Sequence, residues 1–401
     1  MSTEPSPPAP AEPLAAVVAP GPAGCPSCGA EVFLDQSFCE ACGFGLTPSV
    51  APAEPDGAGL ESPITLSSAL RPGVVVEPDP EPTLRPCQSC GGVVGPDGYC
   101  ETCGTKAVSE RDHYTEQPAP WVAACCDRGI RHHRNEDATA IHADPMPGSR
   151  AVLVVCDGVS TSQDSDVASL AGARAARDEL VAQQPAGLGV PASRAAATAS
   201  AMVSATARAN AAVIDHTAPE SDNAASCTFA AAVIEGGLVV FGNVGDSRVY
   251  WIPDAGQSEA PQELSLDDSV AQFRISTGVP REQAEKGPQA HAITKWLGRD
   301  SPDFVPRTGS VTLGCTGWLL VCSDGLWNYC SAAEDLQALM ADLGAATAEP
   351  LVLARDLVAW ANAQGGKDNI SVALARHHGP VGDPAPLASP APTDSPAPTE
   401  S

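Results

Sequence analysis

Three aspartates that each stand at the end of an apolar, strand-like run are the residues of this sequence best suited to chemistry. Asp157, Asp246 and Asp324 all follow such a run. An unpaired carboxylate is costly at the end of a buried strand, so three of them together require a cation that gathers the strand ends. The pattern therefore indicates a divalent-metal site.

Two more acidic segments extend this set. Glu136 and Asp137 follow a basic stretch, residues 131–134, and Asp368 precedes the apolar run 370–374. Carboxylate and water oxygens are the ligands that Mg²⁺ and Mn²⁺ prefer, whereas zinc and iron sites are richer in His or Cys. A single Asp-Gly pair is better interpreted as a turn, but the whole set favours a metal site.

The order of these motifs, from about Trp121 to Arg376, resembles the metal-dependent protein phosphatase family, type 2C. The resemblance covers nearly two thirds of the chain. The motifs that carry it are Asn135-Glu136-Asp137, Asp157-Gly158, Ser226-Cys227-Thr228, Gly245-Asp246-Ser247-Arg248, Ser323-Asp324-Gly325-Leu326-Trp327 and Lys367-Asp368-Asn369-Ile370.

The resemblance implies an α+β fold, a four-layer αββα sandwich of two antiparallel sheets flanked by helices, with the metals at one end of the sheets. It also implies hydrolysis of phosphoserine and phosphothreonine in proteins by a hydroxide that bridges two Mn²⁺ or Mg²⁺ ions. Asp157 would bridge the two metals, and the Gly158 carbonyl would add a ligand. Asp324 and Asp368 would ligate one metal, and Glu136 would ligate the other, directly or through water.

Two further aspartates have roles that the resemblance implies. Asp137 would orient bound water, and Asp246 matches a position linked in the family to a third metal. The alternative for Asp246 is a structural role in the Gly-Asp-Ser-Arg turn, paired with Arg248.

The arginine that would hold the substrate phosphate is not defined by the sequence. Counting back from Glu136, the family's arginine position holds His132, with Arg131 and Arg134 nearby. Either arginine could supply the planar guanidinium that suits a phosphate, or could be a solvated surface charge. Both are therefore candidates.

Eight cysteines form two quartets of Cys-x-x-Cys-Gly pairs with spacers of ten and nine residues. Two such pairs complete a tetrahedral Cys₄ site, which favours zinc over an iron–sulfur centre or redox dithiols. The quartets resemble short zinc ribbons and predict two structural Zn²⁺, held by Cys25, Cys28, Cys39 and Cys42, and by Cys87, Cys90, Cys100 and Cys103.

Composition, apolar periodicity and the two resemblances together predict the organisation of the chain. The predicted segments are a disordered Pro/Ala-rich start (1–24), zinc ribbon 1 (25–43), a disordered linker (44–86), zinc ribbon 2 (87–104), a linker (105–120), the phosphatase domain (121–377) and a disordered tail (378–401). Within the domain we predict helices at 166–180 and 193–216 and from Pro350, an antiparallel meander of 228–234, 238–243 and 248–252, and strands at 151–156 and 318–322. The segment 264–298 resembles the flap beside the active site of the family.

The overall charge bears on partners and location. A net charge of −27 offers no basic footprint for nucleic acid or an anionic membrane. No run approaches the length needed to span a bilayer, and no signal peptide is evident, so a cytoplasmic protein is expected. Its expected partners are proteins phosphorylated on Ser or Thr by cytoplasmic kinases.

Two other functions are compatible with the sequence. His132 and Val159–Thr161 differ from the residues that the family usually has at these positions. These differences are compatible with a catalytically weak scaffold that binds phosphoproteins and is recruited through its ribbons. A regulator whose active part is the ribbons would need basic or aromatic ribbon surfaces, and the few ribbon aromatics are better explained as small cores. Retention of Glu136, Asp157, Asp324 and Asp368 favours the phosphatase.

Overall fold

The computed structural model describes residues 23–24, 31–32, 90–95, 98–105, 107, 109–183, 190–218, 220–345 and 349–379. The chain divides into two units, Met1–Pro72 and Gly73–Ser401. In the first unit, β1 (Ala23–Gly24) pairs antiparallel with β2 (Glu31–Val32). The predicted disordered segments lie almost wholly outside the described residues, as do five of the predicted zinc ligands, Cys25, Cys28, Cys39, Cys42 and Cys87.

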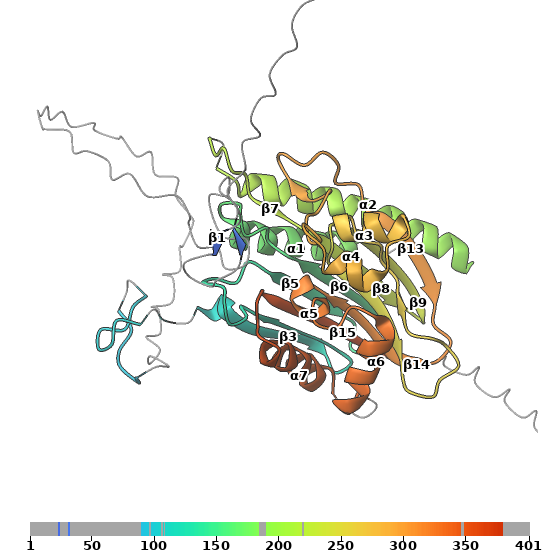
Figure 1. The fold of residues 1–401 in the computed structure, drawn as a ribbon. Coiled ribbons are helices and arrows are strands. Elements are labelled where there is room, and N and C mark those ends of the chain that lie inside the picture. Colours follow the sequence, from blue (N-terminus) through green and yellow to red (C-terminus); the bar gives the residue numbers. More distant parts are fainter. Residues whose placement is uncertain are drawn as a thin grey trace, which may run out of the picture. The chain divides into compact units, whose positions relative to one another are not determined.

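Two antiparallel sheets form the centre of the second unit (Figure 1). The six-stranded sheet runs, in spatial order, β11 (Gln262–Glu263), β10 (Arg248–Pro253), β14 (Thr316–Cys322), β15 (Ile370–His378), β4 (Val122–Asp127) and β3 (His113–Ala119). The five-stranded sheet runs β13 (Arg307–Thr312), β9 (Leu238–Val244), β8 (Phe229–Glu235), β6 (Arg150–Cys156) and β5 (Ala138–Ala143). A short pair joins β7 (Ser226–Cys227) to β12 (Leu297–Gly298).

Helices cover the outer face of each sheet. The helices α1 (Ser165–Ala182) and α2 (Pro191–Asp215) pack on the five-stranded sheet. The helices α6 (Ala333–Asp342) and α7 (Pro350–Ala363) pack on the six-stranded sheet, near the short α5 (Asp324–Trp327). The predicted four-layer αββα sandwich is therefore confirmed.

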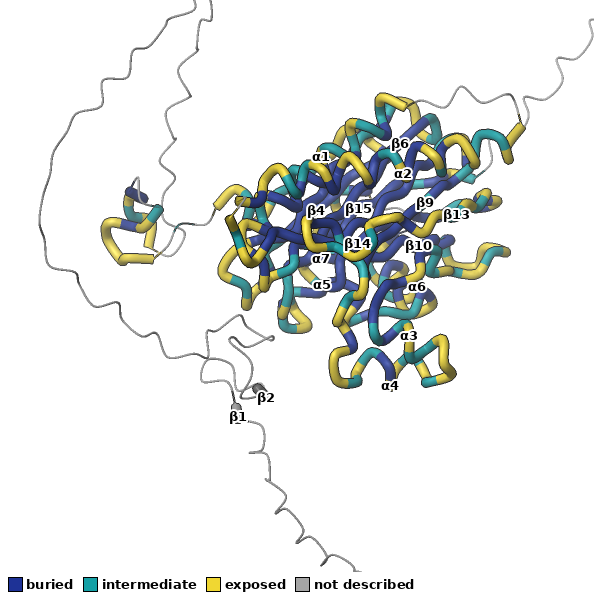
Figure 2. Tube along the Cα trace, turned by 90° about the horizontal axis from the view of Figure 1, so that it is seen from above, coloured by how far each residue is buried: buried dark blue, intermediate teal, exposed yellow. Residues whose placement is uncertain are grey.

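Burial explains why these layers form. One apolar cluster lies between the sheets and includes Leu153, Trp251 and Leu319, and each helical layer closes a further cluster against its sheet. All seven residues of β6 are buried, which is typical of a strand covered on both faces. Figure 2 shows these strands as a dark blue interior under partly exposed helices.

The predicted meander is wrong in its third strand. The strands β8 and β9 pair as predicted, but β10 pairs with β14 and β11 in the other sheet. Every residue of β10, including Tyr250 and Trp251, is buried, so the strand needs cover on both faces, which a central position in the six-stranded sheet provides. Propensity identifies such a strand but does not distinguish a hairpin from a crossover.

The predicted linker at 105–120 also needs correction. The 3₁₀ helix η1 (Glu110–Asp112) and β3 lie within it, and β3 pairs with β4 at the edge of the six-stranded sheet. Its polar, half-exposed residues and Pro118 suit an edge strand, and the same features resemble a linker in the sequence. The sheet thus begins before the predicted boundary.

The flap predicted at 264–298 contains two short helices, α3 (Val270–Ser276) and α4 (Arg281–Glu285). A small buried cluster of Ala271, Ala284 and Ala290 holds them together. None of the helices in the described part of the chain is long and apolar enough to cross a bilayer.

Candidate active site and cysteine cluster

The antiparallel register brings the predicted acidic residues to one end of the two sheets. In the five-stranded sheet Cys156 pairs with Ala138, so Asp157 follows one strand where Asp137 precedes its neighbour. In the six-stranded sheet Cys322 pairs with Val372, so the segment after β14 meets the segment before β15. The two sheets therefore contribute carboxylates to the same edge.

Hydrogen bonds between the motifs hold this edge together. The Asp157 amide donates to Thr228 Oγ1 at 3.0 Å, and the Thr228 amide donates to the Asp157 carbonyl at 2.7 Å. Thr228 Oγ1 in turn lies 2.7 Å from Ser247 Oγ. On the other side, the Glu136 amide donates to Asn369 Oδ1 at 2.8 Å. These hydrogen bonds thus link the motifs quoted above to one another.

The Asp-Gly pairs at 157–158 and 324–325 are close-approach positions. A Cβ on Gly158 would lie 2.5 Å from the Glu136 carbonyl oxygen, and one on Gly325 would lie 1.9 Å from the Asn369 carbonyl oxygen. Neither glycine has a positive φ. A left-handed turn is therefore not the reason for these two glycines. Glycine is needed at both positions because the backbone of a neighbouring motif approaches too closely for a side chain.

Two buried carboxylate oxygens at this edge have no donor. Asp137 Oδ2 accepts from Ser323 Oγ at 2.7 Å, and Asp324 Oδ2 accepts from Asn328 Nδ2 at 2.9 Å. The Oδ1 atoms of both aspartates are buried without a hydrogen-bond partner. A buried anion in this state is costly, and a bound cation would offset the cost.

The charges at this edge repel one another. Burial, and then repulsion from Asp137, hold the pKa of Asp157 well above its ordinary value. Burial raises the pKa of Asp137 to about 7, and the pKa values of Asp324 and Asp368 to about 6 each. Burial and the neighbouring Asp324 also raise the pKa of Asp246. Oxygen donors with this much negative charge fit Mg²⁺ or Mn²⁺.

Glu136 differs from the aspartates because donors surround it. Arg134 donates to Glu136 Oε1 from Nε at 3.0 Å and from Nη2 at 2.7 Å, and Ser165 Oγ donates to the same oxygen at 2.5 Å. Although burial opposes the change, the donors His132 and Ser165 lower the pKa of Glu136 to about 2. Arg134 is thus bound to Glu136.

The two candidate arginines have different surroundings. Both are exposed, but unlike Arg134, Arg131 has no side-chain partner among the described residues. His132, in the position of the family's arginine, places Nε2 3.3 Å from Asp368 Oδ1 and Nδ1 3.7 Å from Glu136 Oε2. Of the two candidates, Arg131 is therefore the one whose guanidinium is not engaged by another side chain in the described part of the chain.

Arg248 does not pair with Asp246, the partner considered for it in that turn, but with two acidic residues of the flap. Its Nε and Nη2 atoms donate to Asp267 at 3.0 and 2.7 Å, and Nη2 donates to Glu285 at 3.1 Å. Its Cζ lies 3.6 Å from the centroid of the Trp327 ring. Arg248 thus joins the core to the flap. Asp246 has Asp324 and Asp267 as its acidic neighbours.

Sequence reasoning missed several residues of the site. Ser323 and Asn369 lie inside the quoted motifs, where their contacts with Asp137 and Glu136 could have been suspected from adjacency. His291 had no such signal, because it is an isolated histidine in the flap. It nevertheless lies beside Asp246 and Asp324.

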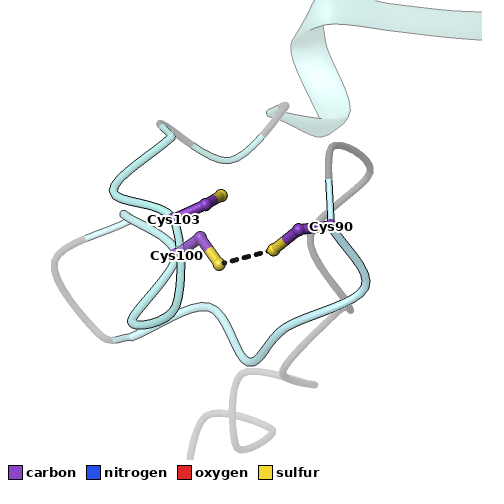
Figure 3. A group of neighbouring side chains, drawn as sticks. All are labelled: Cys90, Cys100 and Cys103. Atoms are coloured by element: carbon purple, nitrogen blue, oxygen red, sulfur yellow. Dashed lines mark hydrogen bonds between the residues drawn. The ribbon is translucent and has the colours of Figure 1, made fainter.

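Three of the predicted zinc ligands lie together (Figure 3). The sulfurs of Cys90, Cys100 and Cys103 are within 4.8 Å of one another, and those of Cys90 and Cys100 are 3.5 Å apart. The hydrogen bond with the Thr105 side chain lowers the pKa of the Cys103 thiol to about 6. The thiolate is the form of cysteine that binds metals, so these three sulfurs are grouped and charged as a metal site requires.

Known proteins resemble this chain along the region that contains the site. Residues 129–361 match the sequence model of protein phosphatase 2C. The serine/threonine phosphatase stp of Listeria innocua is 28% identical over 263 residues, which are 63% of this chain and 94% of the relative. The protein phosphatase PhpP of Streptococcus pneumoniae is 33% identical over 136 residues, 34% of this chain and 51% of the relative.

A solved structure gives the same result for the fold. The serine/threonine phosphatase Stp1 from Staphylococcus aureus superposes with a TM-score of 0.52 at 26% identity, covering 64% of this chain and 95% of that one. The family match includes more than half of this chain and four of the quoted acidic motifs. The chain belongs to the protein phosphatase 2C family.

Proposed function

We propose that the protein is a metal-dependent phosphatase that hydrolyses phosphoserine and phosphothreonine in proteins. The observation that carries this proposal is the buried edge where four other aspartates act on Asp157 and two carboxylate oxygens lack a donor. Membership of the family and the names of the relatives support the same reaction.

Each residue at this edge has a part in the proposed reaction. Asp157 would bridge two Mn²⁺ or Mg²⁺ ions, with the Gly158 carbonyl and Glu136 as further ligands. Asp324 and Asp368 would hold one of the ions. These ions would supply a nucleophile from water near neutral pH and offset charge on the phosphoryl oxygens.

Other side chains would position these groups and the substrate. Arg134 would hold the Glu136 carboxylate in place, since it already donates to it twice. Ser323 would fix Asp137, whose second oxygen could then orient water. Arg131, exposed and without a side-chain partner in the described region, would bind the substrate phosphate.

The proposed partners are proteins phosphorylated on Ser or Thr by cytoplasmic kinases, and we propose a cytoplasmic location. The strongly negative net charge supports protein substrates and not nucleic acid, because the phosphate backbone would be repelled.

The direct test is hydrolysis of a phosphothreonine peptide by the purified full chain. We expect phosphate release that requires added Mn²⁺ and stops when a chelator is added. The absence of release from a folded protein with bound Mn²⁺ would contradict the proposal.

A second candidate is a catalytically weak scaffold that binds phosphoproteins. His132 favours it, because this ring stands at the family's arginine position and faces two carboxylates. The same assay separates the two functions: a scaffold would bind the phosphopeptide in the presence of Mn²⁺ and leave it intact.

We also propose that each cysteine quartet binds one structural Zn²⁺. The full chain is expected to contain about two zinc ions, and a Cys90→Ser variant about one, because a Cys₄ site that loses a thiolate binds zinc poorly. Elemental analysis of protein dialysed against a weak chelator measures this. Cys330→Ser is the matched control, since Cys330 packs in the apolar core. Equal zinc in the Cys90→Ser variant and the wild type would contradict the proposal.

A further inference from the structure

Two exposed cations lie on hydrogen-bonded segments at the carboxylate edge, and only one of them has a part in the proposed reaction. Arg131 and Lys367 are both exposed. The peptide group that joins Gly366 to Lys367 accepts hydrogen bonds from the Ile130 amide at 2.9 Å and from the Arg131 amide at 3.1 Å. The backbone that carries Lys367 is therefore bonded directly to the backbone that carries Arg131.

The backbone of Lys367 is also fixed relative to the metal edge. Gly366 has a φ of 49°, and a Cβ there would lie 2.8 Å from the Ile130 amide nitrogen, so glycine suits the turn before Lys367. The Lys367 amide donates to Tyr329 Oη at 3.0 Å. The next residue is Asp368, a proposed metal ligand. The folded core thus sets where the lysine begins, and only its four-carbon stem is free to move.

The described part of the protein neutralises neither cation. The side chains of Arg131 and Lys367 have no ion-pair or hydrogen-bond partner among the described residues. Arg134 differs, because it binds Glu136 at 2.7 Å and lies 4.0 Å from Asp166. In a chain with a net charge of −27, two such cations beside the site favour an anion that comes from another molecule.

The charge of the whole chain does not decide what binds at this point. Charges more than about 8–10 Å apart are largely screened at physiological ionic strength, so a bound peptide responds mainly to its nearest side chains. An extended peptide advances by about 3.4 Å per residue. When a phosphate is bound to Arg131, the residues that flank it are therefore close to the segment that carries Lys367.

We propose that Lys367 is a specificity-determining residue that selects phosphopeptides with an acidic side chain within two residues of the phosphoserine or phosphothreonine. Arg131 holds the phosphate, and the Lys367 ammonium pairs with the flanking Asp or Glu. The proposal rests on the proposed function, because it takes the phosphoryl group to lie at the carboxylate edge next to Arg131. What it adds is the class of substrate.

Peptide binding to the Mn²⁺-loaded full chain tests this selection without turnover. Two fluorescent peptides carry a non-hydrolysable phosphonate at the phosphothreonine position, one with two Glu on each side of it and the other with two Gln on each side. The wild type is expected to bind the Glu peptide about three- to fivefold more tightly at low ionic strength, the effect of an exposed ion pair. Lys367→Gln should bind both peptides equally, and about 1 M salt should abolish the preference of the wild type.

The matched control is Arg194→Gln. Arg194 pairs with Glu235 at 2.9 Å, and Glu235 lies opposite Arg150, at the other end of β6 from Asp157. This variant changes the net charge by the same amount as Lys367→Gln, and it should keep the preference of the wild type. Equal binding of both peptides by the wild type, a preference that persists in Lys367→Gln, or its loss in Arg194→Gln as well would overturn the proposal.

Hydrolysis of the corresponding phosphothreonine peptides separates this inference from the proposed function. We expect a lower KM for the Glu peptide with a similar kcat, and a KM difference that disappears in Lys367→Gln. A wild type that hydrolyses neither peptide, yet shows a binding preference that depends on Lys367, would count against the proposed function alone. Hydrolysis of both peptides with equal KM and equal binding would leave the function intact and refute the role of Lys367.

Discussion

An Asp157→Asn variant is expected to lose Mn²⁺-dependent hydrolysis of a phosphothreonine peptide by roughly 10³-fold, since a shared metal ligand contributes several kcal/mol to transition-state stabilisation. Burial and four other aspartates raise the pKa of Asp157, and its carboxylate is the one proposed to bind both ions. Initial rates at saturating Mn²⁺ measure the loss. Activity within a factor of two of the wild type would refute the assigned role.

The matched control for this variant is Asp178→Asn. Asp178 lies on α1 with 67% of its side chain exposed, and it pairs with its neighbour Arg177. It carries the same chemical change on the surface, where an ion pair contributes little. Its rate is expected to equal that of the wild type.

Asp157→Asn should lower activity but raise the stability of the metal-free protein, because it neutralises one of the repelling carboxylates. Burial raises the pKa of Asp137 to about 7 from its ordinary value of 3.8, so the folded state binds more protons than the unfolded state between these pH values. Stability without metal should therefore fall as the pH rises from about 4 to about 7. Asp157→Asn removes part of the repulsion and should raise the melting temperature at pH 7 by roughly 3 °C or more.

Mn²⁺ should remove this pH dependence, because a bound cation offsets the same charges. Thermal unfolding at several pH values, with Mn²⁺ or with a chelator, measures the effect. A metal-free protein that gains stability as the pH rises through this range would contradict the interpretation of the site as a set of repelling carboxylates.

An Arg248→Met variant is expected to lower the free energy of unfolding by about 3–5 kcal/mol, the usual cost of removing one partner from a buried ion pair. The Arg248 side chain is 1% exposed, and that of its partner Asp267 is fully buried. The change leaves the Asp267 and Glu285 carboxylates without their shared cation and removes the contact with the Trp327 ring. Urea unfolding followed by tryptophan fluorescence measures the loss.

Two controls separate charge from size in this experiment. Arg281→Met removes an arginine that also binds Glu285 but is 36% exposed, and it should cost about 1 kcal/mol or less. The double variant Arg248→Met with Asp267→Leu removes both buried charges and should recover part of the loss, since the uncompensated carboxylate is gone. A single variant within about 1 kcal/mol of the wild type would show that this arginine does not hold the flap.

The family resemblance that the motifs carry implied the sandwich, and the carboxylates at the ends of apolar runs were sufficient to name the acidic residues that meet at one edge. This succeeds because a buried strand that ends in a carboxylate is rare enough to be informative, and several in a fixed order are more so. The helices at 165–182 and 191–215 were also predicted closely, because their apolar spacing is local.

Only the tertiary structure decided features that depend on contacts between distant segments. It placed β10 in the other sheet, turned the supposed linker at 113–119 into an edge strand, and bound Arg134 to Glu136 while leaving Arg131 exposed. It also brought His291 to the aspartates. A sequence pattern reports the periodicity of one segment, whereas pairing and side-chain approach depend on the packing of the whole chain.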